Sequence, residues 1–141
     1  YYTDGKLPGV GISIGLTRLF YVLSEQGLLS SSMVTSPCDA LVIPMTEDMT
    51  CAVSAATALR DAGIRTQLYT EQKKFKAKMS YADRLKVPYA VIIGEDEAKE
   101  GVVSVKNMRT GEQVKTKPED AAALIRLGVA DLDRGSVIVE K

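Results

Sequence analysis

The sequence predicts an α/β fold, in which a mixed, partly parallel sheet of about five strands is flanked by helices. Two observations predict it. Short apolar runs alternate with helical stripes through the middle of the chain, and this rhythm then changes to two neighbouring strands. The composition is that of an ordinary globular protein, because 45% of the 141 residues are hydrophobic, 26% are charged, and 18 Lys+Arg balance 18 Asp+Glu. We expect one domain, or one domain with a fragment of another.

The composition also excludes several classes of function. The chain has no histidine, which excludes Ser-His-Asp catalysis, Cys-His catalysis and any His-ligated metal site within it. Its two cysteines form no CxxC pair, so we expect no metal site, with Cys38 as a linker thiol and Cys51 as a small core residue. No apolar run reaches 18 residues, which predicts no transmembrane helix and no membrane partner. We expect a cytoplasmic location.

The first part of the chain runs from a strand into a helix. Residues 9–15 alternate between apolar side chains and glycine or serine, which predicts a strand with one nearly bare face. From Leu16 the apolar spacing becomes helical and fades at Gly27. Residues 30–38 are rich in Ser, Thr and Pro and uncharged, which is typical of a linker. We therefore predict a fragment over residues 1–29, a linker over 30–38 and a domain over 39–141.

The central part predicts parallel strands joined by helices. Apolar runs at 40–44 and 89–94 are typical of buried strands, and residues 64–69 alternate as a third strand. One helix is expected to start near Thr46 and to end at Gly63. A second helical stripe begins at Phe75.

The last part predicts a hairpin and a helix. Residues 101–106 and 112–115 alternate around a turn-like link, and Pro118 opens a helix with acidic residues in its first turn. The element order β-α-β-α-β-β-β-α therefore predicts a parallel region with an antiparallel hairpin at one edge. Residues 129–141 are ambiguous.

The glycine-rich residues 9–15 suggest one wall of a nucleotide-binding site. A strand face without side chains lets a flat ring lie on the backbone, and Arg18 could clamp a phosphate with its forked guanidinium. The spacing fits neither a dinucleotide fingerprint nor a P-loop. The alternative is close packing of strand on helix, with Arg18 at the surface.

Two charged segments suggest contact with a nucleic acid. Six lysines and arginines against two acids give residues 71–86 a local charge of +4, and Lys74 and Lys78 lie one helical turn apart. Glu95 and Glu97 follow a buried strand, at the end where α/β sheets place ligand sites, and a carboxylate can accept a hydrogen bond from a base. The alternatives are a solvated helix face and an acidic turn without metal.

Residues 7–19 resemble motif 3 of class II aminoacyl-tRNA synthetases in its histidyl form. Four further runs resemble the anticodon-binding domain that the histidyl, threonyl, prolyl and glycyl enzymes of this family share, namely residues 41–44, 59–64, 81–89 and 92–97. The last run, with residues 105–108 behind it, favours the histidyl branch. The resemblance covers roughly residues 5–127.

The resemblance implies the fold of a class IIa synthetase anticodon-binding domain and specific roles for residues. In the whole enzyme Arg18 would be catalytic, binding the terminal phosphate of ATP, and the ATP-binding set would be Gly9, Gly11, Ser13, Gly15 and Arg18. The tRNA-binding set would be Lys74, Lys76, Lys78, Glu95 and Glu97. Such an enzyme is a homodimer that joins histidine to histidine tRNA with ATP and Mg²⁺.

Motifs 1 and 2 are absent from the chain, so we expect this fragment to bind tRNA through the anticodon stem-loop without catalysing charging, and to be monomeric or weakly associated. Two alternatives stay open. One is a synthetase of the threonyl or prolyl type, and the other is a synthetase-like regulatory module that binds RNA or protein.

Overall fold

The computed structural model describes residues 5, 8–29 and 35–130. The chain divides into two compact units, of which the first contains the described residues 8–29 and the second contains residues 35–130. Residues 30–34 of the predicted linker and residues 131–141 of the ambiguous segment lie outside the described residues, so the predicted division at 30–38 stays a prediction.

The helices are α1 (Leu16–Glu25), α2 (Thr50–Asp61), α3 (Phe75–Arg84), α4 (Glu95–Glu100) and α5 (Pro118–Ala130). The strands are β1 (Ala40–Pro44), β2 (Thr66–Leu68), β3 (Tyr89–Ile93), β4 (Val103–Asn107) and β5 (Gln113–Thr116).

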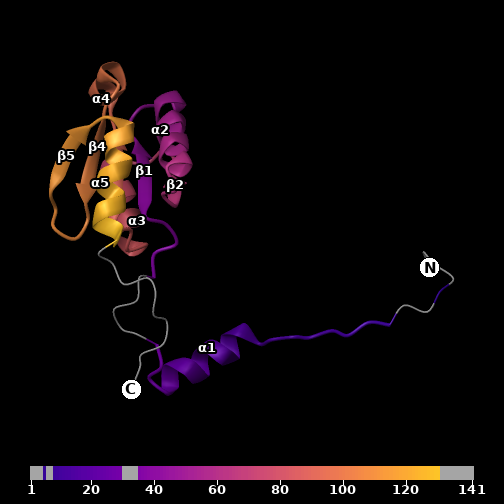
Figure 1. The fold of residues 1–141 in the computed structure, drawn as a ribbon. Coiled ribbons are helices and arrows are strands. Elements are labelled where there is room, and N and C mark those ends of the chain that lie inside the picture. Colours follow the sequence, from indigo (N-terminus) through magenta and orange to yellow (C-terminus); the bar gives the residue numbers. More distant parts are fainter. Residues whose placement is uncertain (1–4, 6–7, 30–34, 131–141) are drawn as a thin grey trace. The chain divides into compact units, whose positions relative to one another are not determined.

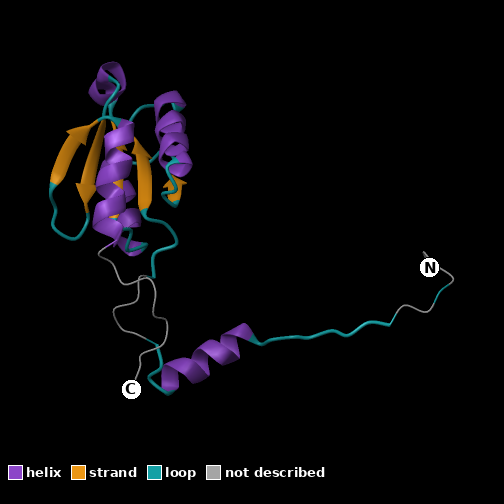
Figure 2. Cartoon of the chain, viewed as in Figure 1, coloured by secondary structure: helices purple, strands orange, loops and turns teal. Residues whose placement is uncertain are grey.

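One sheet of five strands organises the second unit, in the order β2-β1-β3-β4-β5 (Figure 1). β1 pairs in parallel with both β2 and β3, whereas β4 pairs antiparallel with β3 and with β5. Helices α2 and α5 lie on the same face of the sheet (Figure 2). The predicted mixed sheet with a parallel region and an edge hairpin is confirmed.

The core has two halves because alternate side chains of the central strands point to opposite faces. Ala40 and Val42 belong to the cluster that contains the inner residues of α2 and α5. Leu41 and Ile43 belong to a second cluster, which includes Ala82 of α3. All five residues of β1 are buried, which explains why its sequence is apolar without alternation.

The helices differ from the sequence expectation at the start of α2, at the end of α3 and in the additional helix α4. α2 begins at Thr50 rather than near Thr46, with Met49 as its N-cap residue. The Asp48 carboxylate, one residue earlier, accepts a hydrogen bond from the Thr50 N–H (2.9 Å) and so pairs the first N–H of the helix. Helix α3 ends at Arg84, and Lys86 then adopts a left-handed conformation with φ of 53°. Residues 95–100, for which the sequence predicted no helix and offered an acidic turn as one alternative, form α4.

The first unit departs from its prediction in one respect. Helix α1 forms as expected, but residues 8–15 contain no strand. Val10, Ile12 and Ile14 are 96%, 87% and 73% exposed. A strand is defined by hydrogen bonds to a neighbouring strand. No strand pairing of this segment occurs within the described residues, which is why the alternating pattern produces none.

Candidate nucleic-acid interface

Three parallel strands end at one edge of the sheet, and the segments that follow them gather there. Helix α2 connects β1 to β2 over one face, and α3 connects β2 to β3 over the other. β1 and β3 are therefore neighbours whose connections leave in opposite directions, the arrangement at which α/β sheets bind ligands. The Met45 N–H donates to the Ile93 carbonyl oxygen at 2.8 Å, which ties the two strand ends together.

The segment after β2 carries a lysine cluster, which we define as Lys73, Lys74 and Lys76. All three side chains are exposed, and Phe75 between them is 44% exposed. The Lys73 ammonium lies 2.7 Å from the Glu71 carboxylate, and this contact lowers the pKa of Glu71. Within the described residues Lys74 and Lys76 form no ion pair. The cluster therefore offers two uncompensated ammonium groups beside an exposed aromatic ring.

The expectation that Lys74 and Lys78 share an exposed helix face is wrong. Lys74 is the N-cap residue of α3 with extended backbone angles, and its carbonyl oxygen accepts a hydrogen bond from the Lys78 N–H at 3.2 Å. The Lys74 side chain is exposed, whereas that of Lys78 is not. Lys78 is only 4% exposed, and its ammonium donates to the Pro44 carbonyl oxygen at 2.5 Å. Lys78 therefore belongs to the interior side of α3.

Sequence reasoning missed Tyr69, which contacts that buried lysine. The Lys78 Nζ lies 5.7 Å from the centre of the Tyr69 ring, and the Tyr69 hydroxyl donates to Glu71 at 3.3 Å. Tyr69 follows the alternating residues of β2 and is buried. The alternating pattern of residues 64–69 could have predicted that the Tyr69 side chain faces the interior at the sheet edge.

Glu97 connects α4 to the hairpin. Its carboxylate accepts hydrogen bonds from the Gly94 N–H (3.1 Å) and the Ser104 hydroxyl (3.1 Å), and it lies 3.0 Å from the Lys115 ammonium. The hydrogen bond from Lys115 is the main reason that the pKa of Glu97 lies below its ordinary value. Glu97 therefore already has structural partners, whereas Glu95 is exposed in the first turn of α4.

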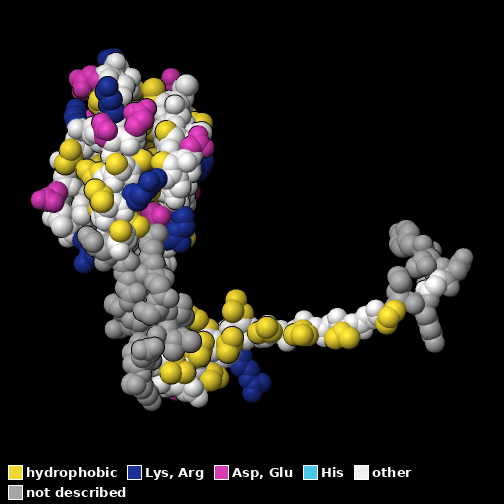
Figure 3. Space-filling view, viewed as in Figure 1, with side chains coloured by type: hydrophobic (Ala, Val, Ile, Leu, Met, Phe, Trp, Pro, Cys, Tyr) yellow, Lys and Arg dark blue, Asp and Glu magenta, His cyan; other side chains and the backbone are white. Residues whose placement is uncertain are grey.

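The acidic residues and the lysine cluster come from the same edge of the sheet, since β2 and β3 run parallel to β1. Figure 3 shows the face of the second unit that α2 and α5 cover, on which Lys and Arg side chains are interspersed with Asp and Glu, whereas α3 lies over the other face. Any recognition of RNA here would combine both kinds of charge.

The glycine segment and Arg18 lie in the first unit. Gly9, Gly11, Ser13 and Gly15 are exposed, and a Cβ on Gly9 or Gly11 would meet no atom within 4 Å. Arg18, in the first turn of α1, is also exposed. The described residues of this segment therefore form no walled pocket for a nucleotide on their own.

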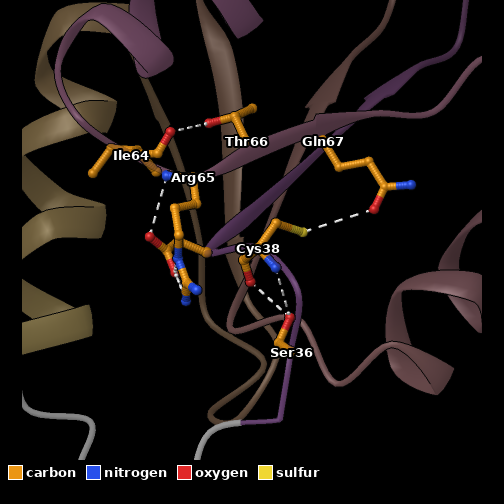
Figure 4. A network of polar contacts seen from close by, with 7 residues as sticks. Ser36, Cys38, Ile64, Arg65, Thr66 and Gln67 are labelled. Atoms are coloured by element: carbon orange, nitrogen blue, oxygen red, sulfur yellow. Dashed lines mark hydrogen bonds and ion pairs between the residues drawn. The ribbon is translucent and has the colours of Figure 1, made fainter. Parts of the chain in front are cut away.

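The expectation that Cys38 is a linker thiol is wrong, because Cys38 is 4% exposed and packs in the second core cluster. Its thiol lies 4.0 Å from the Gln67 side-chain oxygen, and the Ser36 hydroxyl donates to the Cys38 carbonyl oxygen (Figure 4). Burial raises the pKa of the thiol. Beside it, the Arg65 guanidinium pairs with the buried Asp39 carboxylate at 2.9 Å.

Strand β2 borders a groove with a volume of about 830 Å³. Arg60 lines this groove and donates two hydrogen bonds of 3.1 Å to the Thr66 carbonyl oxygen. The Arg60 guanidinium thus hydrogen-bonds a backbone carbonyl oxygen of β2, which is an edge strand and has no neighbouring strand on that side. Among the described residues, no helix is long and apolar enough to cross a membrane.

The fold and the sheet edge define a class of protein. A profile described as "Anticodon binding domain" matches residues 39–127, and the chain belongs to this family.

The particular relatives are histidine–tRNA ligases. The chain is 48% identical over 126 residues to the "Histidine--tRNA ligase" of Clostridium tetani (strain Massachusetts / E88), covering 89% of this chain and 29% of that protein. It is 42% identical to that of Finegoldia magna, covering 79% of this chain and 26% of that protein. Among solved structures, histidyl-tRNA synthetase from Nostoc sp. PCC 7120 superimposes with a TM-score of 0.68 and 30% identity, covering 82% of this chain and 26% of that one.

The resemblance to histidyl-tRNA synthetases and the anticodon-binding fold are thereby confirmed. The chain spans between a quarter and three tenths of the length of these relatives.

Proposed function

We propose that this chain is the tRNA anticodon-binding part of a histidine–tRNA ligase and that it binds the anticodon stem-loop at the edge where β1, β2 and β3 end. The observation that carries the proposal is that the segments after β2 and β3, which hold the lysine cluster and α4, leave the same edge of the sheet in an anticodon-binding domain. Basic side chains supply affinity for phosphates, and an acceptor beside them can select a base.

Each exposed residue has a definite role in the proposal. Lys74 and Lys76 contact backbone phosphates as point charges, and the exposed Phe75 ring offers a face on which a base stacks. Glu95 accepts a hydrogen bond from a base edge. Glu97, whose oxygens already bind Lys115 and Ser104, acts by holding α4 in place.

We infer that the longer protein joins histidine to histidine tRNA with ATP and Mg²⁺, as a cytoplasmic homodimer. This inference is supported by the relatives, which are called histidine–tRNA ligases. The chain spans less than a third of the length of each relative. The chain itself is expected to bind tRNA without charging it. The predicted ATP-binding residues form no pocket by themselves in this chain, namely Gly9, Gly11, Ser13, Gly15 and Arg18. In the proposal they act on ATP only within the longer protein.

The proposal is tested by titrating the 141-residue chain with histidine tRNA and with an anticodon-swapped copy at several salt concentrations. Replacing Lys74 with Ala should weaken both RNAs alike and reduce the salt slope by about 1, which corresponds to one phosphate contact. Replacing Glu95 with Gln should change the ratio between the two RNAs by about 1–3 kcal/mol, the scale of a good base contact.

Asp61→Asn is a matched control for Glu95→Gln, because Asp61 is an exposed carboxylate at the end of α2. This control should leave the ratio unchanged. Equal, salt-insensitive binding of both RNAs, or no binding at all, would contradict the proposal.

A further inference from the structure

Helix α3 buries a lysine beside a row of exposed ones. Lys78 is 4% exposed, whereas Lys74 and Lys76 are exposed to solvent. The Lys78 ammonium donates to the Pro44 carbonyl oxygen at 2.5 Å and lies 5.7 Å from the centre of the Tyr69 ring. The ammonium therefore joins α3 to the last residue of β1 and to the residue that follows β2.

The charge of this side chain needs an explanation beyond packing. A buried ammonium loses its hydration, and a salt bridge would be the usual compensation. Within the described residues Lys78 has no carboxylate partner in a salt bridge. An apolar side chain of similar length would fill the same volume without this cost. The positive charge strengthens two contacts of Lys78, namely the hydrogen bond to the Pro44 carbonyl oxygen and the cation–π contact with the Tyr69 ring.

Those contacts continue outward to the lysine cluster. The hydroxyl of Tyr69 donates to Glu71 at 3.3 Å, and Glu71 in turn pairs with Lys73 at 2.7 Å. The Tyr69 ring is also fixed from a second side, because it packs edge-on against Tyr81 with the ring centres 5.3 Å apart. A row of contacts therefore leads from the buried ammonium to the exposed Lys73.

We propose that Lys78 is a positioning residue for RNA binding. It holds Tyr69 and the end of β1 so that the loop 70–74 presents Lys73 and Lys74 at the sheet edge, and it makes no phosphate contact of its own. This inference rests on the proposed function, because the surface that Lys78 positions is the proposed RNA-binding edge.

The test compares three Lys→Met variants of the full chain. Lys78→Met removes the buried ammonium. Lys76→Met, at an exposed position of the same helix, is the control for the amide shifts alone. Lys74→Met and Lys76→Met each remove a proposed phosphate contact. Two readouts are used, namely the amide chemical shifts of residues 70–74 by NMR and the affinity for the anticodon stem-loop of histidine tRNA at several salt concentrations.

The expected result separates positioning from direct contact. Lys78→Met should shift the amides of residues 70–74 and weaken RNA binding by roughly tenfold, the scale of one lost charge-assisted hydrogen bond, with an unchanged salt slope. Lys74→Met should reduce the slope by about 1. Lys76→Met should also reduce the slope by about 1 and should leave the amides of residues 70–72 in place.

A salt slope that falls by about 1 in Lys78→Met would overturn the inference, because it would mean a direct phosphate contact. Unshifted loop amides would overturn it as well. If Lys78→Met does not fold, Lys78→Arg serves instead, because it keeps the charge and alters the geometry; wild-type amides and affinity in this variant would overturn the inference. Absence of RNA binding by the unsubstituted chain would refute the proposed function, and the NMR shifts would still decide whether Lys78 positions the loop.

Discussion

Gly128 of α5 lies directly against the hydroxyl of Tyr89 on β3, and a Cβ on this glycine would overlap the phenol oxygen. A glycine inside a helix costs about 1 kcal/mol relative to alanine, so the close approach of the tyrosine accounts for its presence. This contact fastens the last turns of α5 to the centre of the sheet.

Gly128→Ala is therefore expected to destabilise the protein by about 1–2 kcal/mol, because the cost of overpacking exceeds the gain in helix propensity. Urea unfolding measures the change. The control is the double variant with Tyr89→Phe, in which the overlapping oxygen is gone. There Gly128→Ala should cost less than in the parent, and an equal cost in both backgrounds would place the strain elsewhere.

Glu97 predicts how stability changes in acid. The pKa of this carboxyl is lowered from its ordinary value of 4.5, chiefly by the hydrogen bond from Lys115. A depressed folded-state pKa contributes stability that is present above pH 4.5 and is lost as the pH falls through the folded-state pKa. Glu97→Gln should lower the free energy of unfolding at pH 7 by roughly 0.5–1 kcal/mol and make its decline below pH 4.5 shallower.

The measurement is urea unfolding between pH 3 and pH 7. Glu100→Gln, at an exposed position of the same helix, is the control and should keep the acid dependence of the parent. An identical decline in the parent and in Glu97→Gln would show that other carboxyls cause the acid sensitivity.

Lys86 predicts a stabilising substitution. It closes α3 with a left-handed φ of 53°, while its N–H donates to the Asp83 carbonyl oxygen (2.9 Å) and that of Val87 donates to Ala82 (3.2 Å). Glycine adopts this conformation without a Cβ penalty. Lys86→Gly should raise the free energy of unfolding by about 0.5–1 kcal/mol.

Gly63 allows the reverse substitution, from glycine to a residue with a Cβ, at another left-handed position. Its φ is 82°, and a Cβ there would meet no atom within 4 Å. Gly63→Ala should lower the stability by about 1 kcal/mol through backbone strain alone. Thermal or urea unfolding of both variants checks the pair, and changes of the same sign would refute the argument.

The start of the second unit predicts how far the chain can be shortened. Ser36 and Cys38 are buried, and Asp39, just before β1, pairs with Arg65, just before β2. A fragment of residues 35–130 should unfold in one cooperative step, since both core clusters lie within it. A fragment that starts at residue 40 should be about 1–3 kcal/mol less stable, because it lacks these contacts. A non-cooperative transition of the longer fragment would mean that its core needs the rest of the chain.

The sequence by itself determined the central sheet and most of the helices. The apolar runs over β1 and β3 are buried on both faces, and their pattern depends only on local periodicity and on the need to exclude water. The hairpin of β4 and β5 and the start of α5 at Pro118 were predictable for the same local reason. The resemblance of residues 92–97 to the histidyl branch also came from the sequence.

Only the tertiary structure decided which charged residues are available to a ligand. Lys78 and Lys76 are two residues apart and chemically alike, yet one is buried against Pro44 and the other is exposed. Glu97 is engaged by Lys115 from the hairpin, a partner 18 residues further along the chain. Residues 9–15 have the alternation of a strand and form none among the described residues. Side-chain burial, ion pairs and strand pairing all depend on groups that are distant in sequence, and local periodicity carries no information about which of those groups will be present.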